Sequence, residues 1–151
     1  MTDVARGEQE LAEAIVRGMM ARDAFSQWLG IEILEIAPRR STVRMAVRDD
    51  MVNGFGVSHG GIVYSLADSA LAFASNTNGR VTVSIENGIS YPVAVHPGNV
   101  LTAVAVEDSA SNRLAFYTVT VRNESGVTVA IFRGTVYRTR QDHLPNASTH
   151  E

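Results

Sequence analysis

The sequence predicts an α+β domain in which a curled antiparallel sheet wraps around one long apolar helix. Residues 62–78 contain neither Pro nor Gly and carry apolar side chains at helical spacing, which predicts a buried helix. Strand-like segments precede and follow this helix. Strands of about 8 to 11 residues span roughly 27 to 37 Å, enough to cover a helix of about 27 Å. The chain has 151 residues and is 45% hydrophobic, so one domain with a single core accounts for it.

Residues 1–29 are expected to form an N-terminal helix on the surface of this domain. Within residues 8–28 the apolar side chains recur on one helical face, and charged side chains mostly occupy the others. Gly30 ends this helix, and residues 31–36 and 42–48 then predict two strands separated by a turn. The apolar face of the helix consists of Leu11, Ile15, Met19, Phe25 and Trp28.

The central helix is expected over residues 58–78, with Ser58 as its N-cap and Gly79 as its C-terminal stop. Its apolar stripe consists of Ile62, Val63, Leu66, Ala67, Ala70, Phe73 and Ala74. The other side carries small or polar residues and offers a ligand or a second chain a place to approach. This polar seam consists of Ser65, Asp68, Ser69, Ala72 and Asn76.

Four strands are expected after the central helix, as successive antiparallel neighbours. They cover residues 82–91, 100–106, 114–122 and 127–138. Turn residues between the runs favour tight connections. A single domain then spans residues 1–139, and residues 140–151, which lack periodicity, are expected to form a loose C-terminal tail.

Composition excludes several classes of protein and site. A net charge of −3 gives no field that would attract nucleic acid or an anionic membrane. Cysteine is absent, which excludes disulfides, Cys metal sites and a thiol nucleophile. The sequence has no basic-then-apolar leader and no run near the roughly 20 apolar residues of a membrane span, so we expect a cytoplasmic protein. No metal site is expected, because His96 lies in a turn and His143 and His150 lie in the tail.

Asp68 is a carboxylate on a mostly apolar helix, where an unpaired charge is costly. Gly60 and Gly61 lie at the positive end of that helix, where exposed N–H groups can bind a developing oxyanion. Eight residues separate Gly60 from Asp68, so the two lie about 12 Å apart along the helix. If both serve one reaction they come from different chains, with antiparallel helices meeting across a two-fold axis. The alternatives are that Asp68 faces water and that the glycines only permit the turn.

Three ordered motifs resemble the signature of hotdog-fold acyl-CoA thioesterases, specifically the PaaI-type group associated with phenylacetate degradation. They are Asn53-Gly54, Ser58-His59-Gly60-Gly61 and Ser65-Leu66-Ala67-Asp68. Residues 89–99 and 132–135 also resemble that group, and the order of elements agrees over residues 23–139. Another hotdog thioesterase group has Thr where Ala72 stands, which favours the PaaI-type assignment. The resemblance implies the hotdog fold, with five to six strands around the central helix.

The resemblance also implies catalytic roles for Asp68, Gly60, Asn53 and His59. In that family the helix aspartate activates water or attacks the thioester, a glycine-turn amide polarises the carbonyl, and the Asn and His complete the site. The residues alone leave two other roles open, a left-handed turn residue for Asn53 and a structural hydrogen bond for His59. The candidates for substrate binding are Gly61, Ser65, Ser84, Glu86 and Arg113. Solvated side chains remain the alternative for the last three.

An acyl-CoA thioester hydrolase acting on an aryl- or medium-chain acyl-CoA, such as a phenylacetyl-CoA-like substrate, follows from the resemblance. Coenzyme A is part of the substrate, so no separate cofactor is expected. The resemblance implies a homodimer with sheets joined edge to edge, and such dimers commonly pair into homotetramers. A non-catalytic acyl-CoA-binding regulator and a hotdog dehydratase are the alternatives. In the family, the regulators typically carry an uncharged residue where Asp68 stands. The dehydratases resemble a different His-containing loop with a Glu on the helix, so the His-Gly-Gly turn and Asp68 differ from that pattern.

Overall fold

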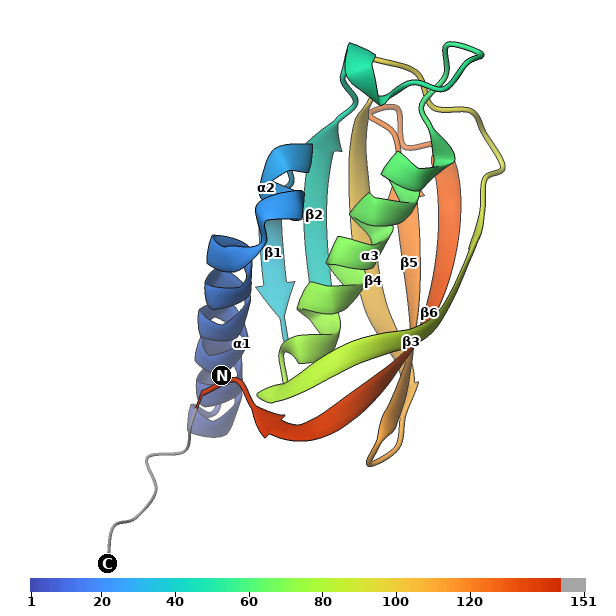
Figure 1. Ribbon diagram of the computed structural model, residues 1–151. Helices are drawn as coiled ribbons and strands as arrows, with labels where there is room; N and C mark the ends of the chain where they lie inside the picture. The colour runs from blue at the N-terminus through green and yellow to red at the C-terminus, as the bar shows by residue number, and fades with distance from the viewer. Residues whose placement is uncertain (145–151) are drawn as a thin grey trace, which may run out of the picture.

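The computed structural model describes residues 1–144, and in it a six-stranded antiparallel sheet curls around a long central helix (Figure 1). The elements are α1 (Asp3–Arg22), α2 (Ala24–Leu29), β1 (Glu32–Ala37), β2 (Arg40–Ala46), the 3-10 turn η1 (Asp49–Met51), α3 (Gly60–Asn76), β3 (Arg80–Ser90), β4 (Val100–Ala110), β5 (Leu114–Arg122) and β6 (Thr128–Asp142). Residues 145–151 lie outside the described part of the chain.

The core forms between α3 and the concave face of the sheet. The apolar stripe predicted for the central helix is buried except at Ile62, which is partly buried. From the sheet, alternate residues of each strand point inward, as Ala103, Val119 and Phe132 do. Full burial of a large apolar side chain stabilises the fold by about 1.5–3 kcal/mol, so α3 is held mainly by this face.

The strand order is β1-β2-β4-β5-β6-β3, which corrects the prediction that β3 to β6 are successive neighbours. Tight connections do make β4, β5 and β6 neighbours, but β3 pairs with the far edge of β6. Residues 91–99 between β3 and β4 are long enough to cross the mouth of the curled sheet, whereas the connections among β4, β5 and β6 are not. As a result β3 is one free edge of the sheet, and β1, which has α1 beside it, is the other (Figure 1).

The single N-terminal helix expected over residues 1–29 is two helices. Asp23 has a non-helical backbone (φ −90°, ψ 81°) and separates α1 from α2. Its carboxylate accepts a hydrogen bond from Ser26 N at 2.9 Å and so caps α2. Phe25 and Trp28, placed on the buried face by periodicity, are 53% and 58% exposed, because the break at Asp23 interrupts the helical periodicity that put them on that face. Gly30 ends α2 in the left-handed conformation, as predicted.

The boundaries of the central helix and of the tail also differ from expectation. α3 begins at Gly60, and its N-cap is His59 rather than Ser58. The last strand continues to Asp142, because Thr82 and Arg80 of β3 give it a partner, so the tail is shorter than residues 140–151. The remainder of the predicted tail, including His150, lies outside the described residues. None of the helices within residues 1–144 is long and apolar enough to cross a membrane.

Candidate active site

Asp68 lies in the middle of α3 and faces β3 across a hollow of about 300 Å³. The carboxylate is partly buried, and burial raises its pKa above the usual value because an apolar surrounding disfavours the charged form. The hollow is lined by Asp68, Leu71, Ala72, Ser75, Thr82, Val83, Ser84 and Val136. A carboxylate with a raised pKa beside a hollow is the usual sign of a functional group.

Asn87 on β3 is the hydrogen-bond partner of this carboxylate. Its Nδ2 lies 3.3 Å from Asp68 Oδ1 and 3.1 Å from the hydroxyl of Tyr64. Neither Asn87 nor Tyr64 was predicted from the sequence as a site residue. A bulge between Ser84 and Glu86 changes which side chains of β3 point inward, so alternation alone could not assign Asn87 to the inner face. The sequence offered one sign of this role: Asn87 is a polar residue inside a segment predicted to be a strand.

At the N-terminus of α3 the two glycines differ in what their N–H groups do. His59 Nδ1 accepts the Gly61 N–H at 2.9 Å, which makes His59 the helix cap. The Gly60 N–H has no acceptor among residues 1–144, so it is the one left to bind an anion. The hydroxyl of Tyr91 donates to Gly60 O at 2.8 Å and covers one side of this turn. Tyr91 was another residue that the sequence analysis did not identify.

Gly60 and Asp68 are both on α3, as predicted, and eight residues apart. At 1.5 Å per residue the glycine amide and the carboxylate are separated by about 12 Å along the axis. Both cannot contact one carbonyl group within a single chain. The geometry therefore leaves the carboxylate without an oxyanion donor and the amide without a base in the same chain.

The polar seam on α3 is narrower than predicted. Ser69 is buried against α2, where its hydroxyl lies 2.8 Å from that of Ser26. Asn76 is also buried, and its side chain bonds the backbone of Thr82 at the start of β3. Ser65, Asp68 and Ala72 remain accessible in part. α2 covers the seam at Ser69 and β3 covers it at Asn76, so Ser65, Asp68 and Ala72 are the members that can meet a second chain.

Asn53 lies in the loop before α3 and organises that loop. Its Oδ1 accepts from Phe55 N at 2.9 Å and from Val57 N at 3.4 Å, an Asx-type turn. Asn53 therefore forms a turn, as the alternative interpretation predicted, but its backbone is not left-handed. The loop projects Phe55 into solvent, with 92% of its surface exposed.

The candidates for substrate binding are not all brought together. Ser84 lines the Asp68 hollow, and Ser65 donates its hydroxyl to Gly61 O at 2.7 Å. Glu86 lines a second hollow, which Asn87 and Gly134 also line. Arg113 lies in the β4–β5 turn, at the end of the sheet away from the N-terminus of α3 (Figure 1). One chain thus places Ser84 beside Asp68, places Glu86 in the hollow on the other side of Asn87, and keeps Arg113 at the far end of the sheet.

A short chain of hydroxyls connects α2 to α3 next to Asp68. Asp23 Oδ2 accepts the Ser26 hydroxyl at 2.6 Å, and that hydroxyl meets Ser69 Oγ. Since Ser26 gives its only proton to the carboxylate, Ser69 is the donor to Ser26. The negative charge of Asp23 adds to burial in raising the pKa of Asp68, although it is a smaller cause.

Replacing Asp23 with Asn removes this charge and keeps a good N-cap. We expect the pKa of Asp68 to fall, because a like charge no longer disfavours its ionised form. Titration of the Asp68 carboxyl carbon by ¹³C NMR measures this. Asp3→Asn, at the other end of α1 and about 30 Å away along the helix, is the control that should leave the pKa unchanged.

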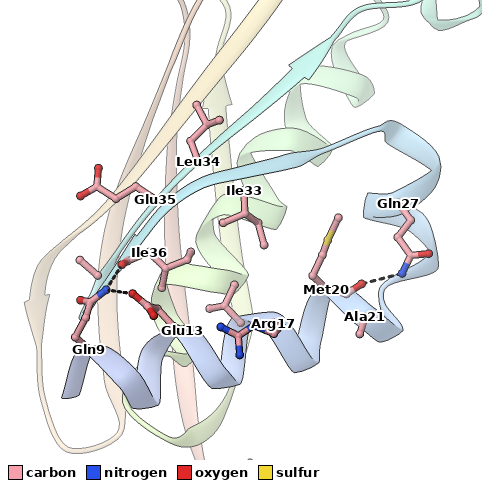
Figure 2. Close-up of a pocket in the computed structure, with 12 residues that line it drawn as sticks. Gln9, Glu13, Arg17, Met20, Ala21, Gln27, Ile33, Leu34, Glu35 and Ile36 are labelled. Carbon is pink, nitrogen blue, oxygen red and sulfur yellow. Dashed lines mark hydrogen bonds between the residues drawn. The ribbon is translucent and has the colours of Figure 1, made fainter. Parts of the chain in front are cut away.

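A groove of about 760 Å³ lies elsewhere, between α1 and β1 (Figure 2). Its apolar floor includes Val16 and Ile33, and Glu13 and Arg17 project over it from α1. Gln9 closes one end by donating to Ile36 O at 2.6 Å. Neither Asp68 nor Gly60 lines this groove, so it is separate from the candidate active site. Within residues 1–144, no three His, Asp or Glu side chains are grouped to hold a metal ion.

The thioesterase superfamily matches this chain over residues 55–130, the segment that contains the Gly-Gly turn and α3. The chain therefore belongs to the thioesterase superfamily, and its sheet curled around α3 is the hotdog fold.

Within that superfamily the chain is similar to PaaI proteins. Acyl-coenzyme A thioesterase PaaI of Escherichia coli is 34% identical over 120 residues, which cover 80% of this chain and 86% of that protein. The solved structure of E. coli PaaI has a TM-score of 0.87 and 31% identity, covering 89% of this chain and 97% of the other. A mutant of PaaI from Thermus thermophilus has a TM-score of 0.75 and 42% identity, covering 78% and 100%. The protein is accordingly an acyl-CoA thioesterase, and the predictions of fold, family and enzymatic class are confirmed.

Proposed function

We propose that this protein hydrolyses an aryl- or medium-chain acyl-CoA at two equivalent sites, each made by two subunits. One observation carries the proposal: the Asp68 carboxylate and the unbonded Gly60 N–H lie on one helix about 12 Å apart. A thioester carbonyl that needs both groups must take them from different chains. Two α3 helices packed antiparallel across a two-fold axis would place each Asp68 beside the Gly60 of the other chain.

In the proposed reaction the Gly60 N–H of one subunit stabilises the negative charge that develops on the thioester oxygen. Asp68 of the other subunit either removes a proton from the attacking water or attacks the carbonyl carbon to form a mixed anhydride. In the first route water adds to the carbonyl carbon, the C–S bond breaks, and the CoA thiolate and the acid leave, with the proton taken up by Asp68 passing to the thiolate. In the second route the C–S bond breaks as the anhydride forms and the thiolate leaves, and water then cleaves the anhydride to release the acid and regenerate Asp68. The raised pKa of Asp68 suits the first route, because it makes the carboxylate a stronger base.

The free edge of β3 supports the proposed dimer. This strand has unpaired backbone groups along its outer side, and Val83 and Ile85 on it are 47% and 59% exposed. An exposed apolar edge strand is a surface that pairs with another chain. The opposite edge strand, β1, has α1 beside it. We propose that two sheets join through β3 and that such dimers associate into tetramers.

Several residues are proposed to assist. Ser84 lines the hollow beside Asp68 and is placed to orient water or the acyl group. Gly61 and Ser65 flank the approach from Gly60, and His59 and Asn53 hold the turn that exposes the Gly60 N–H. Glu86 lies in the hollow beside Asn87, and Arg113 lies at the far end of the sheet in the same chain.

The substrate class is supported by the relatives. One is a PaaI protein from a phenylacetic acid degradation operon, and another is a phenylacetic acid degradation protein. A phenylacetyl-CoA-like thioester is therefore the first compound to try. No metal or added cofactor is proposed for the reaction.

Thiol release from acetyl-, hexanoyl-, phenylacetyl- and palmitoyl-CoA tests the proposal. We expect the highest kcat/KM for phenylacetyl-CoA or hexanoyl-CoA. Binding of every compound without thiol release would instead indicate an acyl-CoA-binding regulator. Loss of water from a hydroxyacyl-CoA without thiol release would indicate a dehydratase.

A further inference from the structure

We propose that Asn87 and Gly134 together position the Asp68 carboxylate, with Asn87 holding one of its oxygens and Gly134 providing the space in which Asn87 lies. This inference rests on the proposed function, because it assigns the two residues to the step that Asp68 performs. Neither residue contacts the reacting atoms in the proposed mechanism, so both are positioning residues.

The Asn87 amide nitrogen is surrounded by oxygens. Tyr64 Oη, Asp68 Oδ1 and Ser84 Oγ lie 3.1, 3.3 and 3.4 Å from Nδ2. An ionised carboxylate can only accept hydrogen bonds, so the amide must turn its nitrogen toward Asp68. The ionised state of Asp68 thereby selects the orientation of Asn87. In return, Asn87 holds Oδ1 of the carboxylate and leaves Oδ2 without a partner among residues 1–144.

The carbonyl oxygen of the Asn87 side chain does not stabilise the fold. Its Oδ1 is buried and has no hydrogen-bond partner within the described chain. A buried acceptor without a donor costs free energy, and an apolar residue of the same shape would avoid that cost. The cost is explained if the amide is kept for what its nitrogen does to Asp68.

Gly134 explains how the Asn87 side chain fits. The two residues are direct partners in the β3–β6 ladder, so they lie side by side on the same face. A Cβ at Gly134 would be 2.9 Å from Asn87 Oδ1 and 2.5 Å from Cδ2 of Leu71, the next turn of α3 after Asp68. The backbone of Gly134 is not left-handed, so conformation does not require glycine there. The close approach of both Leu71 and Asn87 requires it.

The charged and titratable groups around Asp68 are few. They are Asp23 at the cap of α2 and Tyr64 on α3 itself, while β3 presents Ser84 and Asn87 and β6 presents only Gly134 and Val136. The hydrogen bond from Asn87 lowers the pKa of Asp68 and so opposes the effect of burial. Loss of Asn87 should therefore raise that pKa and leave less carboxylate at a given pH.

Asn87→Leu and Gly134→Ala test the inference, with Asn112→Leu in the exposed β4–β5 turn as the matched control. We expect Asn87→Leu to fold, to lower kcat for the preferred acyl-CoA about tenfold or more, and to change KM less than about threefold. The acid limb of the rate profile should move to higher pH. Gly134→Ala should change kcat and the acid limb in the same directions, and Asn112→Leu should change none of these.

A titration that needs no substrate separates this inference from the proposed function. ¹³C NMR of the Asp68 carboxyl carbon should show a higher pKa in Asn87→Leu than in the wild type. An unchanged pKa together with an unchanged kcat would overturn the positioning role, even if the wild type hydrolyses acyl-CoA. Absence of hydrolysis in the wild type would instead overturn the proposed function and leave the titration as the test of the Asn87–Asp68 contact. If Gly134→Ala does not fold, Asn87→Leu alone decides.

Discussion

Replacement of Asp68 with Asn is expected to lower kcat for thioester hydrolysis by about 10³-fold or more while making the folded protein more stable near neutral pH. The loss of activity follows because Asn can neither accept a proton from water nor attack the carbonyl. The gain in stability follows because the wild type holds a partly buried carboxylate whose charge is disfavoured by its surroundings.

The pH dependence of this gain has a definite sign. Folding raises the pKa of Asp68 above the ordinary value of 3.8, so the folded state favours the protonated form. The contribution of Asp68 to stability is fully present below pH 3.8 and is lost as the pH rises through its folded pKa. The difference in stability between Asp68→Asn and the wild type should therefore be largest at pH 7 to 8 and vanish in acid.

Thermal unfolding from pH 3 to pH 8 measures this difference, and thiol release measures kcat on the same preparations. Asp142→Asn, at the exposed end of β6, is the control for removing one carboxylate from the surface. A variant that keeps the activity of the wild type would remove Asp68 from the mechanism. A variant that is less stable at pH 7 would show that the carboxylate is compensated by interactions not seen in the single chain.

Removal of the Gly60 N–H is expected to lower kcat by about 10² to 10³-fold, the usual effect of losing one oxyanion donor. Gly60→Pro removes this N–H at the first residue of α3, a position where proline suits a helix. His59 has an extended backbone (φ −60°, ψ 134°), which proline requires of the residue before it. Since the Gly60 N–H has no acceptor within residues 1–144, its removal breaks no hydrogen bond of the fold.

Gly60→Ala is the matched control. It adds a Cβ 3.2 Å from the Tyr91 ring, as proline also does, but keeps the N–H. We expect Gly60→Ala to lose no more than about tenfold, so the difference between the two variants isolates the hydrogen bond. Equal losses would show that crowding against Tyr91, and not the amide, is responsible.

The same pair of residues tests whether each site takes groups from two chains. In a mixed dimer of Asp68→Asn and Gly60→Pro, one site keeps both groups and the other loses both. Equal co-expression with random pairing gives half mixed dimers, so we expect about a quarter of the wild-type activity from two nearly inactive parents. Mixed dimers that form without recovering activity would contradict a site built between subunits.

Much of the fold could be predicted because its signals are local. The periodicity of residues 62–78 identifies α3, and the alternation of the later runs identifies the strands. The spacing of Gly60 and Asp68 needs only the rise of a helix, so the separation of the two groups was also predictable. The helix boundaries were less predictable. Asp23 and His59 are the N-caps of α2 and α3, and whether a residue caps a helix depends on the conformation of the adjacent backbone.

The surroundings of Asp68 could not be predicted in the same way. Asn87 reaches Asp68 only because a bulge in β3 turns its side chain inward. Gly134 matters only because β6, and not β4, is the neighbour of β3. Tyr91 covers Gly60 from a loop thirty-one residues later in the chain. Strand register and long-range pairing decide these contacts, and a single sequence does not encode them in any local pattern.

By itself the sequence determined the elements, the apolar helix at the centre and the two chemical groups on it, because side-chain periodicity and helix geometry are properties of short segments. Only the tertiary structure decided which strand is the free edge and which amide holds the Asp68 carboxylate. Those features depend on how segments far apart in the chain pack together, and packing settles the burial and hydrogen bonding that give Asp68 its raised pKa.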